Sequence, residues 1–318
     1  MRHRPMRVIC HLAHLTAPLP RVVLTLGNFD GVHLGHQAIV RRAVAEARAL
    51  GGQVVVLTFH PHPVAVLAPD RAPPMLQSLH DRLALLRDLG VDVTIVQRFT
   101  PGFAATEPEA FVRDFLQRHL DLRHVVVGYN VSFGRKRAGT VDTLRTLGAR
   151  HGFAVDDVGP VTVGETKVSS SGVRALVAAG DVQGAQALLG RPFSLRGRVV
   201  RGEQRGRTLG FPTANLHRPS GLVLPADGVY AVRAVLNGTR HDAVLNVGVR
   251  PTFGELRRTI EAFLLDFDEE LYGRWLTLEL VERLRGEQRF AGVEALRQAI
   301  AADVARARDV LQRVVRDA

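Results

Sequence analysis

The stretch LGNFDGVHLGHQ, residues 26–37, decides how the first half of the chain folds. It follows the apolar run Val22–Leu26, which has the length and β-branched content of a buried strand. It leads into residues 37–50, where apolar side chains recur at helical spacing. The order strand, glycine-containing loop, helix is typical of an open α/β sheet, in which ligands bind at the carboxyl ends of the strands. The free N–H groups at the start of such a helix favour an anion.

Two histidines stand at the entrance of the predicted helix. His33 and His36 are three residues apart, so on one helical turn both could donate hydrogen bonds to phosphate oxygens. The alternative is structural: Asp30 caps the helix, the glycines serve the turn and the histidines are incidental. Two histidines at this spacing, with Asn28 and Asp30 beside them, favour a phosphate site.

The segment HLGH resembles the HxGH signature of the nucleotidyltransferase superfamily, and the longer GNFDGVHLGHQ resembles the prokaryotic FAD synthetases. This resemblance implies that His33 and His36 bind the triphosphate of ATP and stabilise charge on the leaving pyrophosphate. They are therefore the expected catalytic residues of this half. We assign Asn28 and Asp30 to nucleotide binding in the same site.

The composition is that of an ordinary globular protein. The 318 residues suffice for two domains, with 46% of them apolar and 23% charged. The single cysteine, Cys10, excludes an internal disulfide framework and a cysteine-based zinc site. No apolar run is long enough to span a membrane, and the N-terminal stretch does not resemble a signal peptide. We therefore expect a cytoplasmic protein with no membrane contact.

The formal net charge of +11 raises the question of a nucleic-acid partner. Nearly all the basic residues are arginines, with Lys136 and Lys167 as the only lysines, and the arginines are scattered among acids. A nucleic-acid interface would gather its cations on one patch. We therefore expect small-molecule substrates and no nucleic acid.

Strands and helices alternate through the first half, as expected for a doubly wound, Rossmann-like parallel sheet. Besides the opening strand and helix, we predict strands at 53–59, 91–96 and 124–127, and helices at 76–90 and 106–120. The fold class of this half is therefore α/β.

The strand at 53–59 ends in His60-Pro61-His62-Pro63, whose prolines enforce an extended loop. Two histidines could ligate a metal, but no cluster of Cys, His or acidic residues completes a site, so a substrate-positioning loop is favoured. The segment TFHPHP resembles the TFxPHP segment of the FAD synthetases. That resemblance implies flavin contacts for His60, Pro61 and His62.

A glycine-rich loop follows the strand at 124–127. Residues 128–140, GYNVSFGRKRAGT, carry three basic side chains, and composition alone fits an exposed turn and a phosphate loop equally well. The loop resembles the G-x-(D/N)-F-x-F-G segment of the FAD synthetases, which implies that Asn130 contacts the nucleotide. Val131 stands where an aromatic residue is usual, so no stacking is expected there.

Residues 167–174, KVSSSGVR, begin another helix. Three serines at a helix entrance can cap it or donate to phosphate. The segment resembles the ISSTxIR motif of the nucleotidyltransferases, which implies that Ser170, Ser171 and Arg174 hold the triphosphate.

The pattern changes after Gly190, where a helix ends and Pro192 forces an extended chain. Short strands with Gly, Asn and Asp in their turns dominate from here, which predicts an antiparallel β-barrel. Val293–Val315 has one apolar stripe and is expected to be a helix packed on that barrel. We therefore divide the chain into a nucleotidyltransferase domain, residues 1–187, and a second domain, residues 188–318.

Residues 202–215, GEQRGRTLGFPTAN, are the second focus. Bottom-up, a phosphate-binding loop and an ordinary hairpin loop explain them equally well; a Walker loop is excluded because GxxxxGK[ST] is missing. GRTLGFPTANL closely resembles the riboflavin kinases. The resemblance implies that Thr213 and Asn215 reach Mg²⁺ and the phosphates of ATP, a role that suits hard oxygen ligands. The other nucleotide-binding residues we assign here are Gly202, Arg207 and Gly210.

Two further segments resemble the riboflavin kinases. NVGVRPTFG, residues 246–254, implies flavin contacts for Asn246, Arg250 and Pro251. IEAFLLDFDEELYG, residues 260–273, places Glu261 at the position of the family's catalytic glutamate. Strand parity puts this carboxylate on a face with apolar side chains, where poor solvation helps it accept a proton. Without the resemblance, an edge glutamate paired with an arginine would be the preferred interpretation.

The resemblance covers nearly the whole chain and implies a bifunctional riboflavin kinase and FAD synthetase. The barrel would phosphorylate riboflavin to FMN, and the first domain would transfer AMP from ATP to FMN. One alternative retains a single working activity, and another is a flavin-binding or nucleic-acid-binding protein without catalysis. The sequence leaves homo-oligomerisation open.

Overall fold

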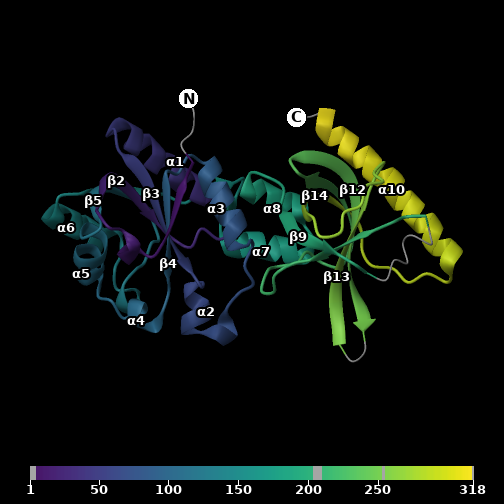
Figure 1. The fold of residues 1–318 in the computed structure, drawn as a ribbon, viewed down its shortest axis with the longest axis horizontal. Helices are drawn as coiled ribbons and strands as arrows, with labels where there is room; N and C mark the ends of the chain where they lie inside the picture. The colour runs from purple at the N-terminus through teal and green to yellow at the C-terminus, as the bar shows by residue number, and fades with distance from the viewer. Residues whose placement is uncertain (1–4, 203–209, 253–254, 317–318) are drawn as a thin grey trace. The chain divides into compact units, whose positions relative to one another are not determined.

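The computed structural model describes residues 5–202, 210–252 and 255–316, without the side chains of 250–252, 255–257 and 314–316. The chain divides into two compact units, Met1–Ser170 and Ser171–Ala318, and each is considered by itself (Figure 1).

A six-stranded sheet forms the centre of the first unit. Its order is β1-β4-β3-β2-β5-β6, and every neighbouring pair is parallel. The strands are β1 (Arg7–Cys10), β2 (Leu19–Leu26), β3 (Gln53–His60), β4 (Val93–Arg98), β5 (Leu120–Gly128) and β6 (Ala154–Val158). This confirms the predicted doubly wound sheet and places the carboxyl ends of β2 and β3 side by side.

Helices cover both faces of the sheet. Successive strand residues point to opposite sides, so apolar strand residues on both faces are buried under helices. Val23 and Val54 pack in one apolar cluster with α1 and α3, whereas Leu24, Val55 and Leu57 pack in another with η3 and α6. The helices are α1 (Leu34–Ala49), α2 (Pro63–Leu67), α3 (Leu79–Asp88), α4 (Pro101–Ala104), α5 (Pro108–Ala110) and α6 (Val141–His151). The remaining elements are the 3₁₀ turns η1 (Leu12–His14), η2 (Pro69–Arg71) and η4 (Arg135–Arg137), the π-helical η3 (Phe111–Gln117), and the hairpin β7 (Thr162–Val163) and β8 (Thr166–Lys167).

The second unit contains a closed antiparallel barrel, as predicted. Its strand order is β10-β13-β12-β11-β14-β9. The strands are β9 (Ser194–Val200), β10 (Ala214–His217), β11 (Gly228–Leu236), β12 (Thr239–Thr252), β13 (Glu255–Leu264) and β14 (Trp275–Arg285). Two helices precede the barrel, α7 (Ser170–Ala179) and α8 (Val182–Leu189).

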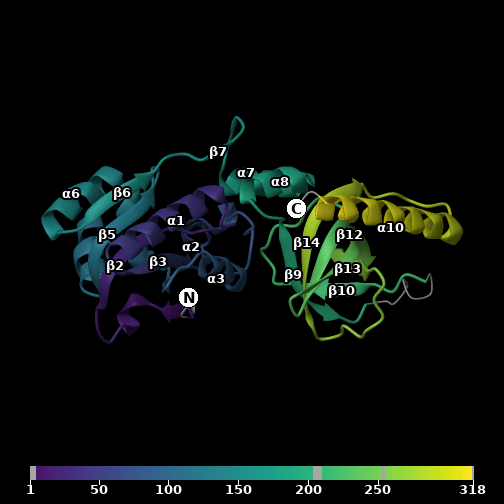
Figure 2. The same ribbon diagram turned by 90° about the horizontal axis from the view of Figure 1, so that it is seen from above.

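The terminal helix α10 (Val293–Arg316) packs along β11, β12 and β14 (Figure 2). Val310 and Leu311 of this helix form an apolar cluster with Val229, Val244 and Leu265 of the barrel side. The predicted apolar stripe is therefore buried on the barrel around Val304, Ala307 and Leu311, whereas Val293 at its start is 66% exposed.

Several elements differ from the sequence-based prediction. The helix predicted at 106–120 is a short turn, α5, followed by the π-helical η3. The edge strands β1 and β6 were not predicted, because β1 has four residues and β6 carries two acids. Strand β10 was not predicted either, since its residues belong to the PTAN segment that was interpreted as loop.

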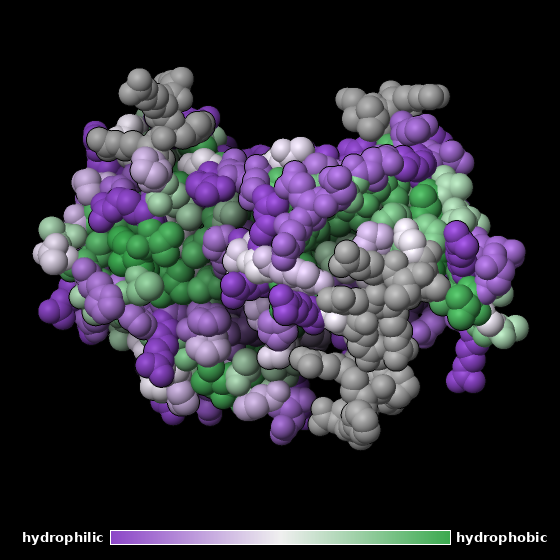
Figure 3. Space-filling model, turned by 45° about the vertical axis from the view of Figure 1, so that its right-hand side comes forward, coloured by the Kyte–Doolittle hydropathy of each residue, from purple (hydrophilic) through white to green (hydrophobic). Residues whose placement is uncertain are grey.

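Many of the arginines form local ion pairs at the surface. Arg42 pairs with Asp156, and Arg308 with Asp266. On the face drawn in Figure 3, hydrophilic side chains are likewise spread among apolar ones. Among the described residues, no helix is both long and apolar enough to cross a membrane.

Candidate active sites

A cavity of about 350 Å³ lies at the carboxyl ends of β2 and β5 in the first unit. Loops after these strands and the start of α1 supply its walls, as the position at the carboxyl edge of a parallel sheet predicts. The cavity brings together the predicted residues Asn28, His33, His36, Asn130 and Ser170.

His33 is the N-cap of α1. Its Nδ1 accepts a hydrogen bond from the backbone N–H of His36 at 3.3 Å. The alternative in which Asp30 caps this helix is therefore wrong. Because Nδ1 accepts, the neutral ring carries its proton on Nε2, which makes Nε2 a donor. Gly35 permits this arrangement, since a Cβ there would lie only 3.2 Å from the ring of His33.

His36 stacks on His33, with ring centroids 3.7 Å apart and an interplanar angle of 17°. Burial holds the pKa of His36 well below its ordinary value, and the charges of His33 and Arg82 add to this effect. His36 is therefore neutral at pH 7. Two stacked imidazoles can then donate to phosphate oxygens without placing two cations in contact.

The backbone that leads to the histidines is strained. Phe29 and Val32 have φ of 50° and 41°, a region that non-glycine residues and above all β-branched ones avoid. Both side chains are buried. Side chains from other segments hold the loop: Thr58 donates to the carbonyl of Asn28, and Gln37 to that of Val32. The surrounding structure therefore determines the conformation of this loop.

In this geometry Asp30 holds the loop in place and is not positioned to contact a bound nucleotide directly. Its carboxylate is 2% exposed and accepts from the backbone N–H of Leu76 at 3.0 and 3.2 Å. Its carbonyl accepts from the Ser170 hydroxyl at 2.8 Å. Asp30 thus ties the loop to the segment before α3 and to the first residue of α7, and it is not among the described residues that line the cavity.

Ser170 is the first residue of α7, and the predicted residues Ser171 and Arg174 follow within its first turns. In the division of the chain into units, Ser170 closes the first and Ser171 opens the second. Ser169 also lines the cavity, so the predicted serine-rich helix entrance reaches the site.

The histidine-proline loop lies at the predicted edge of the sheet, because β2 and β3 are parallel neighbours. His62 caps α2, and its Nε2 lies 3.1 Å from Nδ2 of Asn28. His60 and Pro61 are exposed. His62 therefore contacts the cavity residue Asn28, whereas the exposed His60 and Pro61 are not among the described residues that line the cavity.

Sequence reasoning missed two cavity residues, Lys167 and Tyr129. The Lys167 ammonium lies over the Tyr129 ring, 4.9 Å from its centroid. A cation in an anion site was foreseeable, because Lys167 is one of only two lysines and directly precedes the serine-rich motif.

In the second unit, the sheet register aligns three predicted residues in one row. Glu261 on β13 pairs with Asn215 on β10 and with Asn246 on β12. Directly opposed residues of antiparallel strands share a face, so the three side chains are neighbours. Glu261 is 7% exposed, and its Oε2 accepts from the Thr213 hydroxyl at 3.5 Å.

A cavity of about 550 Å³ also lies on the barrel, but none of the three residues of this row lines it among the described residues. Thr213 forms part of its wall, together with the apolar residues Ala262 and Leu264, which alternate with Glu261 along β13 and therefore lie on the opposite face of that strand. Its rim is the segment 267–272, with Phe267 and Tyr272 at the two ends. Sequence reasoning quoted this segment for its resemblance but assigned no role to it. Apolar walls with aromatic residues at the rim suit a planar ring system.

Of the other predicted residues of this half, the structure describes Gly202 and Gly210. Gly202 packs against the Asn215 amide, which a Cβ at that position would overlap. Gly210 has φ of 86°, which favours glycine. Arg207 lies outside the described residues, and so do the side chains of Arg250 and Pro251.

The residues present fit Mg²⁺. The hydroxyl of Thr213, the amide of Asn215 and the carboxylate of Glu261 are hard oxygen donors on adjacent segments. Mg²⁺ in ATP sites is commonly held by one or two protein groups together with phosphate oxygens. No cluster of three or more His, Cys or acidic residues suited to a metal occurs among the described residues.

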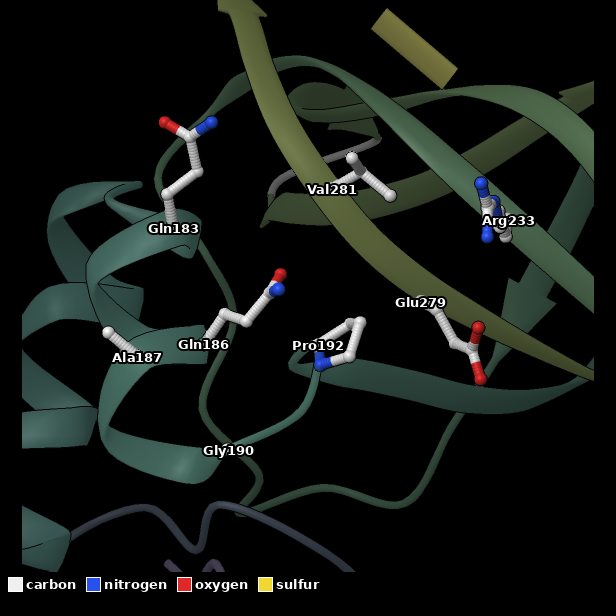
Figure 4. A pocket seen from close by; sticks show the side chains of 8 residues that line it. All are labelled: Gln183, Gln186, Ala187, Gly190, Pro192, Arg233, Glu279 and Val281. Carbon is white, nitrogen blue, oxygen red and sulfur yellow. The ribbon is translucent and has the colours of Figure 1, made fainter. Parts of the chain in front are cut away.

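A third hollow, of about 540 Å³, lies on the outer side of the barrel beside α8 (Figure 4). Gln183 and Gln186 reach it from α8, and Arg233 and Glu279 from β11 and β14. Glu279 is bound by Arg240 at 3.0 and 3.2 Å. No predicted site residue belongs to this hollow.

Comparison with known proteins assigns both halves. The FAD synthetase family model matches residues 16–172, and the riboflavin kinase family model matches residues 189–311. The bifunctional riboflavin kinase/FMN adenylyltransferase of Escherichia coli (strain K12) is 40% identical over 296 residues, covering 92% of this chain and 94% of the relative. The protein of the same description from Bacillus subtilis (strain 168) is 38% identical over 286 residues, covering 88% and 90%.

A solved structure from Streptococcus pneumoniae, described as a macrolide-efflux protein, has a TM-score of 0.87 and 30% identity. It covers 95% of this chain, and 99% of that chain is matched. The fold is therefore shared over both units. Since both family models and full-length relatives match, the chain belongs to the bifunctional riboflavin kinase/FMN adenylyltransferase family.

Proposed function

We propose that each of the two sites, the cavity at the sheet edge and the row through Glu261 on the barrel, carries one of the family's two activities, with Mg²⁺ as the metal and the predicted residues in the roles below. What supports this is that predicted residues gather at two separate places, one at the sheet edge and one on the barrel. The domain boundary is proposed at 187/188, between the end of the first family match and the start of the second.

In the barrel, Glu261 accepts the proton of the riboflavin 5′-hydroxyl while that oxygen bonds to the γ-phosphorus of ATP and ADP leaves. The carboxylate is buried, so little reorganisation of water accompanies the transfer. Thr213 and Asn215 hold Mg²⁺ with the phosphates, and the bound metal neutralises charge on them.

At the sheet edge, a phosphate oxygen of FMN attacks the α-phosphorus of ATP and pyrophosphate leaves. This nucleophile is already an anion, so the site needs no base. His33 and His36 donate to the phosphates, and Lys167 and Ser170 line the same cavity. Catalysis here is positioning and charge stabilisation at the N-terminus of α1.

Chromatographic separation of flavins tests the proposal. With ATP, Mg²⁺ and riboflavin, the chain should form FMN first and FAD afterwards; with FMN in place of riboflavin, it should form FAD directly. Chelation of Mg²⁺ should stop FMN formation. A chain that binds flavins but converts neither would contradict the proposal, and conversion of only one would restrict it to the corresponding half.

A further inference from the structure

Arg82 is a buried cation beneath the adenylyltransferase site. It lies on α3, and the residue is only 3% exposed. Nη1 donates to Oγ1 of Thr58 at 3.2 Å and to the carbonyl of Phe59 at 3.4 Å. Nε is enclosed and has no hydrogen-bond partner among the described residues.

These bonds connect Arg82 to the phosphate-binding loop. Thr58 Oγ1, which accepts from Arg82, donates in turn to the carbonyl of Asn28 at 3.3 Å. The Asp30 carboxylate raises the pKa of Arg82 against the lowering effect of burial, so the two charges are close enough to interact. A single guanidinium thus joins the carboxyl end of β3 to both ends of the segment 28–30.

A purely structural role explains this arrangement poorly. Burying a guanidinium costs several kcal/mol unless all its donors are paired, and an apolar side chain of similar length would fill the space at lower cost. The loop that it supports contains Phe29 and Val32 at positive φ, and such strain persists only where neighbouring groups hold it. Incompletely paired buried groups and held strain are typical of functional sites.

We propose that Arg82 is a positioning residue for FMN adenylylation, whose buried positive charge holds the loop 28–36 and the end of β3 in the arrangement that binds the triphosphate. The proposal rests on the assignment of adenylyl transfer to this cavity. Arg82 does not line the cavity among the described residues, so it acts through the loop.

The charge of Arg82 also acts on His36. The charged groups that act on His36 are His33, the N-cap of its own helix, and Arg82 on α3, while Lys167 on β8 lines the same cavity. Arg82 is one of the causes that lower the pKa of His36. Removing it should therefore raise that pKa, and the acid limb of the pH–rate profile should move to higher pH.

The test compares three variants of the full chain: Arg82→Met, Arg82→Lys and, as the matched control, Arg87→Met, an exposed arginine on the same helix. Arg82→Met should lower kcat for FMN adenylylation by about 10- to 100-fold, because displaced reacting groups lose catalysis steeply. Its pH–rate profile should shift upward, riboflavin kinase activity of the same molecules should be unchanged, and Arg82→Lys should recover most of the rate. Arg87→Met should behave as wild type.

Thr58→Val is a fourth variant, for the case that Arg82→Met does not fold. It keeps the shape of a fully buried residue and breaks only the link from Arg82 to Asn28. It should lower adenylylation kcat more than it changes KM. Wild-type rates in both Arg82→Met and Thr58→Val, or equal losses in Arg82→Met and Arg82→Lys, would overturn the proposal. Wild-type protein that makes no FAD from FMN would instead overturn the assigned activity.

Discussion

The two proposed sites of this chain hold their candidate catalytic groups in different ways. At the sheet edge, His33 and His36 stand on a strained loop and the first turn of a helix, supported by side chains from several other segments. On the barrel, Glu261 is held within a strand, in register with Asn215 and Asn246. The first reaction has an anionic nucleophile and requires charge stabilisation, whereas the second has a hydroxyl nucleophile and requires a placed base. Charge stabilisation is thus assigned to a loop and helix start, and proton abstraction to a residue fixed within a strand.

The largest expected effect is on the kinase activity of the barrel. Glu261→Gln should lower FMN formation by about 10²- to 10⁴-fold, because the amide cannot accept the hydroxyl proton. Conversion of added FMN to FAD should stay at the wild-type rate, measured by chromatography of the flavins. Glu294→Gln, at an exposed position at the start of α10, is the control. Loss of both activities in Glu261→Gln would contradict the separation of the sites.

The next largest effect is expected from changes in the sheet-edge site, which should slow FAD formation. His33→Ala combined with His36→Ala should slow FAD formation from FMN by about 10²- to 10³-fold, since donors aimed at developing charge are removed. Riboflavin phosphorylation by the same variant should be unaffected. The control is His80→Ala, an exposed histidine on α3. Near wild-type FAD formation in the double variant would show that these histidines do not carry the reaction.

Thr213→Val should have a moderate effect confined to the kinase. The KM for ATP at limiting Mg²⁺ should rise about 10-fold, the order of a lost hydrogen bond to a charged group. Steady-state kinetics over a range of Mg²⁺ concentrations measure it, with Thr277→Val on β14 as the control. If the KM for ATP is the same in Thr213→Val as in the wild type, Thr213 does not contribute to the metal site.

Sequence predicted well which residues meet at the sheet edge, because the carboxyl ends of parallel neighbours meet wherever strands and helices alternate. His33, His36, Asn130 and Ser170 accordingly line one cavity. The row through Glu261 could not be predicted, since strand register in a barrel depends on pairings between distant segments. Strand β10 was missed for the same reason: four residues after a proline become a strand only when β9 and β13 flank them.

The smallest effect concerns pH. Because the pKa of His36 is lowered in the folded chain, the unfolded chain binds more protons below the ordinary histidine pKa of about 6.5. The stability contributed by neutral His36 is complete above that pH and is lost as pH falls. His36→Asn should therefore make the unfolding free energy of the first unit less sensitive to acid between pH 7 and the folded pKa. Denaturant titrations of both chains at several pH values measure this difference, and parallel curves would contradict it.

One mixing experiment tests most directly that the chain holds two independent sites. Glu261→Gln and the His33→Ala, His36→Ala double variant are combined in equal amounts with riboflavin, ATP and Mg²⁺, and the flavins are separated over time. Neither variant alone should make FAD from riboflavin, while the mixture should make FMN and then FAD. A mixture that accumulates FMN without FAD, or a single variant that makes FAD by itself, would contradict the account.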